Sequence, residues 1–224
     1  MEHPRLETFW QMSENFILER DSFDLLGVPV RNRYTFIENI RPQNDEQILL
    51  MNTLNHIIRD NRGAFVFVSG GKDTGKTHIC SSFVNSVGRW SNAYDRVTGK
   101  MTDWQPRFVT MQDLIDRITA FRSTKDWYRE YCSQSRVLVV DRWNLTDGKE
   151  PLTPTIKRKL ENLLKVRNDN GFMTILLSRL LWADAFEQFT PAFRQEIPDM
   201  YIRPLARPYR KYETDPFDEE SDYE

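Results

Sequence analysis

A short glycine-containing stretch of the chain has the residue types that bind nucleotide phosphates. Residues 70–77 read Gly-Gly-Lys-Asp-Thr-Gly-Lys-Thr and match the pattern G-x-x-x-x-G-K-[ST]. Glycines let the backbone curl so that successive N–H groups point at phosphate oxygens, and a helix that begins here adds its positive end. The predicted ATP contacts are Gly70, Gly71, Lys72, Asp73, Thr74, Gly75, Lys76, Thr77 and His78.

Three side chains in and beyond this stretch have the chemistry of a magnesium–phosphate site. Lys76 supplies a point charge for the β- and γ-phosphates, and the hydroxyl of Thr77 is suited to ligate Mg²⁺. Asp141 follows four apolar residues, 137–140, about sixty positions later, as an acid does at the end of a neighbouring strand in mononucleotide folds. We therefore expect Lys76 and Asp141 to take part in catalysis, and Thr77 and Asp141 to hold Mg²⁺.

The residue after Asp141 departs from the usual chemistry of phosphate-loop ATPases. These enzymes generally have a carboxylate there that polarises the attacking water, whereas this chain has Arg142. An arginine does not accept a proton at neutral pH. Either a carboxylate of the following loop, such as Asp147 or Glu150, replaces it, or hydrolysis is slow. ATP binding is thus better supported by the sequence than ATP turnover.

Hydrophobic periodicity predicts strands alternating with helices around these residues. Short apolar runs predict strands at 64–69, 108–109, 137–140 and 173–177, with a fifth at 200–202. Helical spacing of apolar residues predicts helices at 5–20, 45–59, 77–87, 111–118 and 156–164. Continuously apolar strands that alternate with amphipathic helices imply a parallel sheet covered on both faces. The predicted fold class is α/β, with a five-stranded parallel sheet.

Composition narrows the class of protein further. The 224 residues, 39% of them hydrophobic, suffice for one domain with short extensions, and no apolar run is long enough to span a bilayer. Two cysteines and three scattered histidines give neither a disulfide framework nor a zinc cluster. Because the first residues also lack a secretory signal, we expect a cytoplasmic protein with no membrane association.

The two ends of the chain differ in character from the middle. Residues 213–224 carry seven of the 33 acidic residues and none of the 31 basic residues, so the rest of the chain is net basic. This acidic stretch is either a disordered solubilising tail or a competitor of nucleic acid for a basic face. The apolar face of the predicted helix at 5–20 either binds a partner or packs on the domain's own core. Composition leaves both pairs of alternatives open.

With these residues placed, the chain resembles the bacterial replicative-helicase loaders of the DnaC/DnaI type. This compact AAA+ family includes transposon ATPases of the IstB type and has no separate lid domain. The similarity extends from about residue 26 to residue 210 and rests on short segments in the family's order, at 26–29, 34–39, 108–115, 163–167 and 208–210. It implies a phosphate-loop AAA+ core at 35–212, an N-terminal helical extension at 1–34 and the acidic tail at 213–224.

The resemblance also implies roles for two arginines and reveals departures. Arg194 stands where the family has its trans-acting arginine finger, and Arg210 where an arginine contacts the nucleotide of its own subunit. The family's sensor strand ends in Thr-Ser-Asn, whereas residues 177–179 read Leu-Ser-Arg and end in Arg179. About 35 residues precede the core, so we expect no counterpart of the loaders' long N-terminal domain. These departures suggest a divergent member, encoded by a phage or a mobile element.

Basic residues interleaved with aromatics suggest where single-stranded DNA could bind, since phosphates need charge and bases need flat faces. The connection from Gly88 to Arg107 is longer than the family pattern leads us to expect, and a second mixed cluster follows it. Packing of each loop by its own aromatics is the alternative for both clusters. The residues concerned are Arg89, Trp90, Tyr94, Arg96, Lys100, Trp104 and Arg107 in the first cluster, and Lys125, Trp127, Tyr128 and Arg129 in the second.

The sequence as a whole predicts an AAA+ protein that binds ATP·Mg²⁺, associates with itself or in a mixed oligomer, and helps place a replicative helicase on single-stranded DNA. One rival is a transposition-type ATPase that coats duplex DNA and recruits a transposase. A second rival is a hydrolysis-dead adaptor that uses ATP only as a structural ligand. Preference for single or double strands separates the first two, and a turnover assay separates the third.

Overall fold

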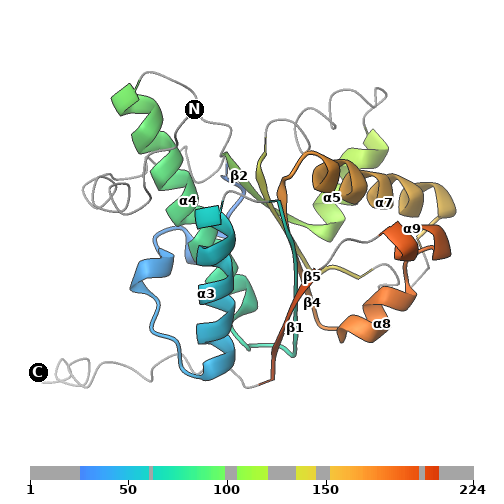
Figure 1. Ribbon diagram of the computed structural model, residues 1–224, viewed down its shortest axis with the longest axis horizontal. Helices are drawn as coiled ribbons and strands as arrows, with labels where there is room; N and C mark the ends of the chain where they lie inside the picture. The colour runs from blue at the N-terminus through green and yellow to red at the C-terminus, as the bar shows by residue number, and fades with distance from the viewer. Residues whose placement is uncertain are drawn as a thin grey trace, which may run out of the picture.

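Five parallel strands form one sheet in the computed structural model of the protein (Figure 1). The structure describes residues 26–60, 63–98, 105–120, 135–144, 152–196 and 200–206. The strands are β1 (Phe65–Gly70), β2 (Pro106–Thr110), β3 (Val137–Asp141), β4 (Met173–Ser178) and β5 (Met200–Leu205). The helices are η1 (Val30–Asn32), η2 (Ile37–Asn39), α3 (Asp45–Asp60), α4 (Lys76–Thr98), α5 (Met111–Ala120), α7 (Pro154–Asp169), α8 (Trp182–Glu187) and α9 (Pro191–Glu196).

The order of the strands brings the ends of β1, β3 and β4 to one edge of the sheet. The order is β2-β3-β4-β1-β5, and every neighbouring pair is parallel. Ser69 of β1 pairs with Ser178 of β4, and Gly70 pairs with Leu205 at the end of β5. The predicted five-stranded parallel sheet is confirmed, and the fifth strand continues from the expected 200–202 to Leu205.

Helices cover both faces of the sheet, as Figure 1 shows with α3 and α4 on one side and α5, α7, α8 and α9 on the other. The central strands β1, β3 and β4 are buried on both faces, so alternate residues enter two separate hydrophobic cores. Val66 and Val68 of β1 pack with α3 and α4, whereas Phe65 and Phe67 pack with the helices of the opposite face. Burial on both faces explains why these strands read as continuous apolar runs.

Helix α4 is longer than its apolar pattern indicated. It begins at Lys76 and continues to Thr98, so the expected long connection that starts at Gly88 is wrong in its first half. Gly88 is tolerated inside the helix because it lets Leu26 approach closely. A Cβ at this position would lie 2.8 Å from Leu26 Cδ1. Glycine lowers the helix propensity at this position, but it permits close packing against the segment that precedes the sheet.

Several sequence predictions fall outside the described residues. They concern the helix at 5–20, the acidic stretch 213–224, Asp147, Glu150, Arg210, Lys100, Trp104, Lys125, Trp127, Tyr128 and Arg129, and the side chains of Tyr94 and Arg96. Within the described ranges, no helix combines the length and the apolar character that crossing a bilayer requires.

Candidate nucleotide-binding site

The predicted phosphate loop connects β1 to α4 at the carboxyl edge of the sheet. Gly70 and Gly75 have φ angles of 152° and 90°, which side chains rarely adopt. A Cβ on Gly70 would lie 2.3 Å from the carbonyl oxygen of Leu205, so the neighbouring strand leaves no room for one. Thr74 Oγ1 donates to Gly71 O at 3.2 Å across the loop. The strand, loop and helix therefore follow one another as the motif requires.

Lys76 points back into the loop that it follows. Its Nζ donates to Gly70 O at 2.7 Å, to Gly71 O at 2.6 Å and to Thr74 Oγ1 at 3.1 Å. The side chain is only 9% exposed. Burial lowers the pKa of Lys76, while the charge of Asp141 opposes that shift. An ammonium group is thus held inside the loop, at the place where phosphate oxygens would meet it.

Thr77 and Asp141 come together from two different elements. Thr77, in the first turn of α4, donates from Oγ1 to Oδ2 of Asp141 at the end of β3, over 3.2 Å. A hydroxyl and one carboxylate are the protein donors that Mg²⁺ uses when phosphate oxygens and waters complete its shell. No group of three or more potential metal-ligating side chains gathers among the described residues. The donor set therefore fits Mg²⁺ bound together with a phosphate.

The other predicted loop contacts lie at the rim. Lys72 and Asp73 are exposed at the tip, with Lys72 Nζ 4.0 Å from Asp73 Oδ2. Asp73 has a φ angle of 60°, in the left-handed region that only a tight loop imposes on such a residue. His78 is turned toward η1, where its Nδ1 lies 3.5 Å from Oδ1 of Asn32. His78 thus links the loop helix to the segment before the sheet.

Arg142, the residue that replaces the expected carboxylate, is exposed and has a φ angle of 60°. Its neighbours hold this unfavourable conformation in place. The Arg142 N–H donates to Asp141 Oδ1 at 2.9 Å, and the Trp143 N–H donates to Leu177 O at 2.7 Å. Ser178 Oγ donates to Trp143 O at 2.8 Å. The turn after β3 is therefore fastened to β4 directly beside Asp141.

Arg179 stands at the same edge, immediately after β4. Ser178 pairs with Ser69, so Arg179 begins the chain's exit from the sheet next to the start of the loop. The positive charge of Arg179 contributes to the lowered pKa of Lys76, after the larger effect of burial. Both positions at which the sequence departs from the family pattern therefore lie at the edge that carries the loop.

Arg194, the predicted arginine finger, lies on α9 and is already engaged within the chain. Its Nη1 is 2.7 Å from Glu187 Oε2, and its guanidinium carbon is 5.8 Å from the centre of the Phe186 ring. Buried Glu161 fixes the start of α9 by accepting from the Thr190 N–H at 2.6 Å and from Thr190 Oγ1 at 2.8 Å. Helix α9 therefore presents Arg194 from a well-anchored turn.

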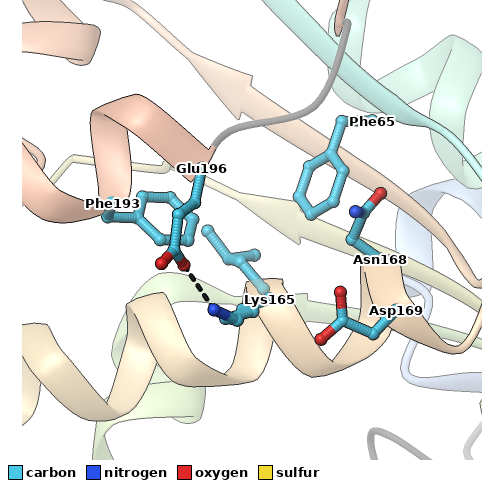
Figure 2. Close-up of a pocket in the computed structure, with 7 residues that line it drawn as sticks. Phe65, Lys165, Asn168, Asp169, Phe193 and Glu196 are labelled. Atoms are coloured by element: carbon cyan, nitrogen blue, oxygen red, sulfur yellow. Dashed lines mark hydrogen bonds and ion pairs between the residues drawn. The ribbon is translucent and has the colours of Figure 1, made fainter.

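The surroundings of α9 place it toward the opposite end of β1 from the loop. Phe193 of α9 and Phe65, the first residue of β1, line the same pocket of about 250 Å³ (Figure 2). An ion pair between Lys165 Nζ and Glu196 Oε2, at 2.5 Å, crosses the pocket. None of the predicted nucleotide contacts lines this pocket. The structure therefore brings Lys76, Thr77 and Asp141 together but does not bring Arg194 to them within one chain.

Two residues of the first proposed DNA-binding cluster, Arg89 and Trp90, pack within the chain. Arg89 is 8% exposed and forms an ion pair with Glu38, and its guanidinium carbon lies 4.2 Å from the centre of the Phe36 ring. Trp90 packs against the hydrophobic core. Arg89 is engaged in attaching α4 to η2, and Trp90 is partly buried against the core. Arg107 belongs to β2, and the remaining members lie outside the described side chains.

A polar row on α4 that the sequence analysis missed holds the segment before the sheet. Asn85 Nδ2 donates to the backbone carbonyls of Asn32, Arg33 and Thr35 at 2.8–3.1 Å. Ser86 Oγ donates to Glu38 Oε2 at 2.6 Å. Polar residues at helical spacing between the apolar positions of α4 were the available signal. Through His78 and this row, the loop helix contacts the N-terminal segment along its length.

Comparison with solved structures identifies the architecture. The "DnaC helicase loader" matches with a TM-score of 0.54 and 18% identity, covering 78% of this chain and 99% of that one. "DnaI" matches with a TM-score of 0.59 and 13% identity, covering 81% and 94%. The chain has the AAA+ fold. No protein-family model matches the chain, and no curated protein sequence matches it.

A third structure shows this AAA+ fold with ligands. It is the "Replication initiator DnaA bound to AMPPCP and single-stranded DNA", with a TM-score of 0.55 and 12% identity. The match covers 80% of this chain and 50% of that one. Identities this low establish the shared AAA+ fold alone.

Proposed function

We propose that this protein binds ATP and Mg²⁺ at the loop between β1 and α4. The observation that carries the proposal is the convergence of Lys76, Thr77 and Asp141 on one loop with the required backbone path. Lys76 would exchange its bonds to loop carbonyls for phosphate oxygens, and Thr77 and Asp141 would hold the metal. Mg²⁺, when bound, neutralises phosphate charge. The DnaA structure, which shares this fold and is bound to AMPPCP, supports nucleotide binding.

Hydrolysis at this site is slow in our proposal. The position after Asp141 is occupied by Arg142, which cannot accept a proton from water. The sensor position after β4 is likewise an arginine, Arg179. Catalytic roles for Lys76 and Asp141 therefore consist of positioning phosphate and metal, and the residue that activates water is not among the groups described at this edge.

We further propose that the protein uses ATP to load or recruit a replicative helicase onto single-stranded DNA. Support comes from the fold, which matches DnaC and DnaI over nearly the whole of those two chains. In this proposal the nucleotide of one subunit is completed by Arg194 of a neighbouring copy, or of a partner, which ties assembly to ATP. Glu187 holds Arg194 until that contact forms.

A hydrolysis-dead adaptor is the second candidate, and the two arginines at the loop edge favour it specifically. Such a protein would bind ATP as a fixed structural ligand and connect a helicase to another partner. It shares the nucleotide site with the loader but predicts no turnover when DNA and the helicase are both present.

A reconstitution with the replicative helicase of the cell in which this protein occurs tests these proposals. The wild-type protein, with Mg²⁺ and AMPPCP, should form a complex with the helicase and increase the amount of helicase on circular single-stranded DNA. Lys76→Ala should abolish both effects. If the helicase is neither bound nor delivered, the loader proposal fails. Preferential binding of duplex DNA would favour the transposition-type rival instead.

A further inference from the structure

Arg142 and Arg179, at the edge of the sheet that carries the phosphate loop, differ in their side-chain contacts from three other arginines of the described chain. Arg89 is paired with Glu38, Arg194 with Glu187, and the buried Arg167 donates to several backbone carbonyls and to Thr174. The side chains of Arg142 and Arg179 have no hydrogen bond or ion pair within the described part of the chain. Both side chains are exposed, so each guanidinium group can bind an anion from outside the chain.

The strand register places these two residues at the ends of adjacent strands, Arg142 after β3 and Arg179 after β4, at the edge that carries the phosphate loop. Arg179 follows Ser178, the partner of Ser69 at the end of β1, and so stands beside the beginning of the phosphate loop. Val140 pairs with Leu176, so Arg142, two residues further along, is level with Ser178. The turn after β3 is fastened to β4, and it holds the backbone of Arg142 beside Asp141.

Cationic side chains gather at this edge. Lys76, Arg142 and Arg179 are cationic, and Arg179 is close enough to Lys76 to act on its pKa. Two carboxylates share this edge, and each accepts a hydrogen bond from a hydroxyl, Asp141 from Thr77 and Asp113 from Thr110. Lys76 is enclosed by the loop, whereas the arginines stand beyond it. An anion that extends past the loop would therefore meet the arginines last.

We propose that Arg142 and Arg179 bind the terminal phosphate of a nucleoside triphosphate within the same chain, so that the site holds ATP in preference to ADP. A guanidinium group matches phosphate oxygens with two parallel N–H donors, which a lysine cannot do. The arginines replace groups that would activate water with groups that hold the phosphate in place. This inference rests on the proposed nucleotide site and specifies its regulation: the ATP-bound state is the persistent one.

Binding of two fluorescent nucleotides tests the inference. Dissociation constants are measured, with Mg²⁺ present, for mant-AMPPNP and mant-ADP on the wild-type protein, Arg142→Ala, Arg179→Ala and Arg179→Lys. Arg158→Ala, an exposed arginine of α7 on the other face of the sheet, is the matched control. The wild type should bind the triphosphate analogue about tenfold or more tightly than the diphosphate, because each charge-assisted hydrogen bond is lost with the terminal phosphate.

Each alanine variant should weaken mant-AMPPNP about tenfold while changing mant-ADP less than about twofold, and Arg179→Lys should recover part of the loss. Arg158→Ala should match the wild type, and thermal unfolding checks that every variant is folded. If a variant weakens the binding of both nucleotides equally, or of neither, the inference is overturned while the proposed nucleotide site is not. A wild-type protein that binds both nucleotides equally does the same. Failure to bind either one overturns the nucleotide site and the inference together.

Discussion

The two ends of strand β1 present opposite chemistry. At its carboxyl end, Gly70 leads into a loop with a buried ammonium group. Two exposed arginines follow β3 and β4 at the same edge, and their side chains make no hydrogen bond or ion pair within the described part of the chain. At its amino end, Phe65 borders an apolar pocket whose charged groups are paired, Lys165 with Glu196, and Arg194 of the adjacent helix is paired with Glu187. Among the described residues, the two arginines at one end have no side-chain partner, whereas Lys165 and Arg194 at the other end are each paired with a glutamate.

This difference shows that the contacts of a cationic side chain indicate its role better than its position in the fold does. Arg89 attaches one helix to another segment and Arg194 is paired with Glu187, whereas Arg179 is placed to bind an anion. Six residues of strand separate the two ends, a length of roughly 17–20 Å. A nucleotide bound at one end therefore reaches an arginine from the other end only through a second chain, which is a head-to-tail contact.

The largest expected difference between the two ends of β1 is the effect of removing a lysine side chain on nucleotide affinity. Lys76→Ala should weaken binding of an ATP analogue about a hundredfold, because a buried charge contact to phosphate is lost. Lys165→Ala removes an exposed ion pair and should leave nucleotide affinity unchanged. Fluorescence titration measures both. Tight binding by Lys76→Ala would show that the phosphate loop is assigned wrongly.

Adjacent glycines offer a matched test of the loop's backbone. Gly70→Ala should destabilise the protein by about 2 kcal/mol, because its Cβ would meet Leu205 O at 2.3 Å and its φ angle suits glycine alone. Gly71→Ala should leave the stability nearly unchanged, since no atom outside its neighbours lies within 4 Å of a Cβ there. Urea unfolding compares the two. Equal midpoints would mean that β5 does not confine the start of the loop.

The residue after Asp141 gives a test of turnover. Wild-type protein should hydrolyse ATP slowly, and Arg142→Glu should raise the rate at saturating ATP about tenfold, because a carboxylate can then polarise water. Saturating nucleotide is needed since loss of the arginine also weakens triphosphate binding. A coupled phosphate-release assay measures the rates. Brisk hydrolysis by the wild type would contradict the account and direct attention to Asp147 and Glu150.

The amino end should matter for assembly and not for nucleotide affinity. Arg194→Ala should weaken ATP-dependent self-association, or joint assembly with a helicase, about fivefold, while the monomer binds ATP as before. Sedimentation with and without AMPPCP, in the presence of partner and single-stranded DNA, gives the affinities. If the variant assembles like the wild type, Arg194 is only a surface residue. If the wild type stays monomeric throughout, the adaptor gains over the loader.

The phosphate loop and Asp141 could be predicted from the sequence because their signals are local. A glycine pattern between an apolar strand and a helix specifies the backbone path, and an acid that ends the next apolar run specifies the metal side. Apolar runs that alternate with amphipathic helices likewise predicted the parallel sheet. The end of α4 was missed because Gly88 reads as a break, and the helix continues there only by packing against Leu26.

The role of a charged side chain could not be predicted, because it depends on residues distant in sequence. The sequence suggested that Arg89 contacts DNA. In the structure its side chain contacts Glu38 and Phe36, about fifty positions earlier in the chain. Buried Arg167 donates to the carbonyls of Ser135, just before β3, and of Met173 in β4. That Arg142 and Arg179 have no side-chain partner among the described residues is likewise visible only in the folded chain. Motif reading gives the position of a charge, and only the fold gives its partners.

The central claim is that a nucleotide binds at the carboxyl end of β1, and amide hydrogen exchange of the wild-type protein with Mg²⁺ and AMPPCP tests it most directly. At concentrations where the protein is monomeric, peptides covering residues 71–77 should exchange more slowly with the nucleotide, because their N–H groups then bind phosphate. Peptides covering α9 at the other end should be unchanged. Protection confined to α9, or no protection at 71–77 with nucleotide in excess, would contradict the claim.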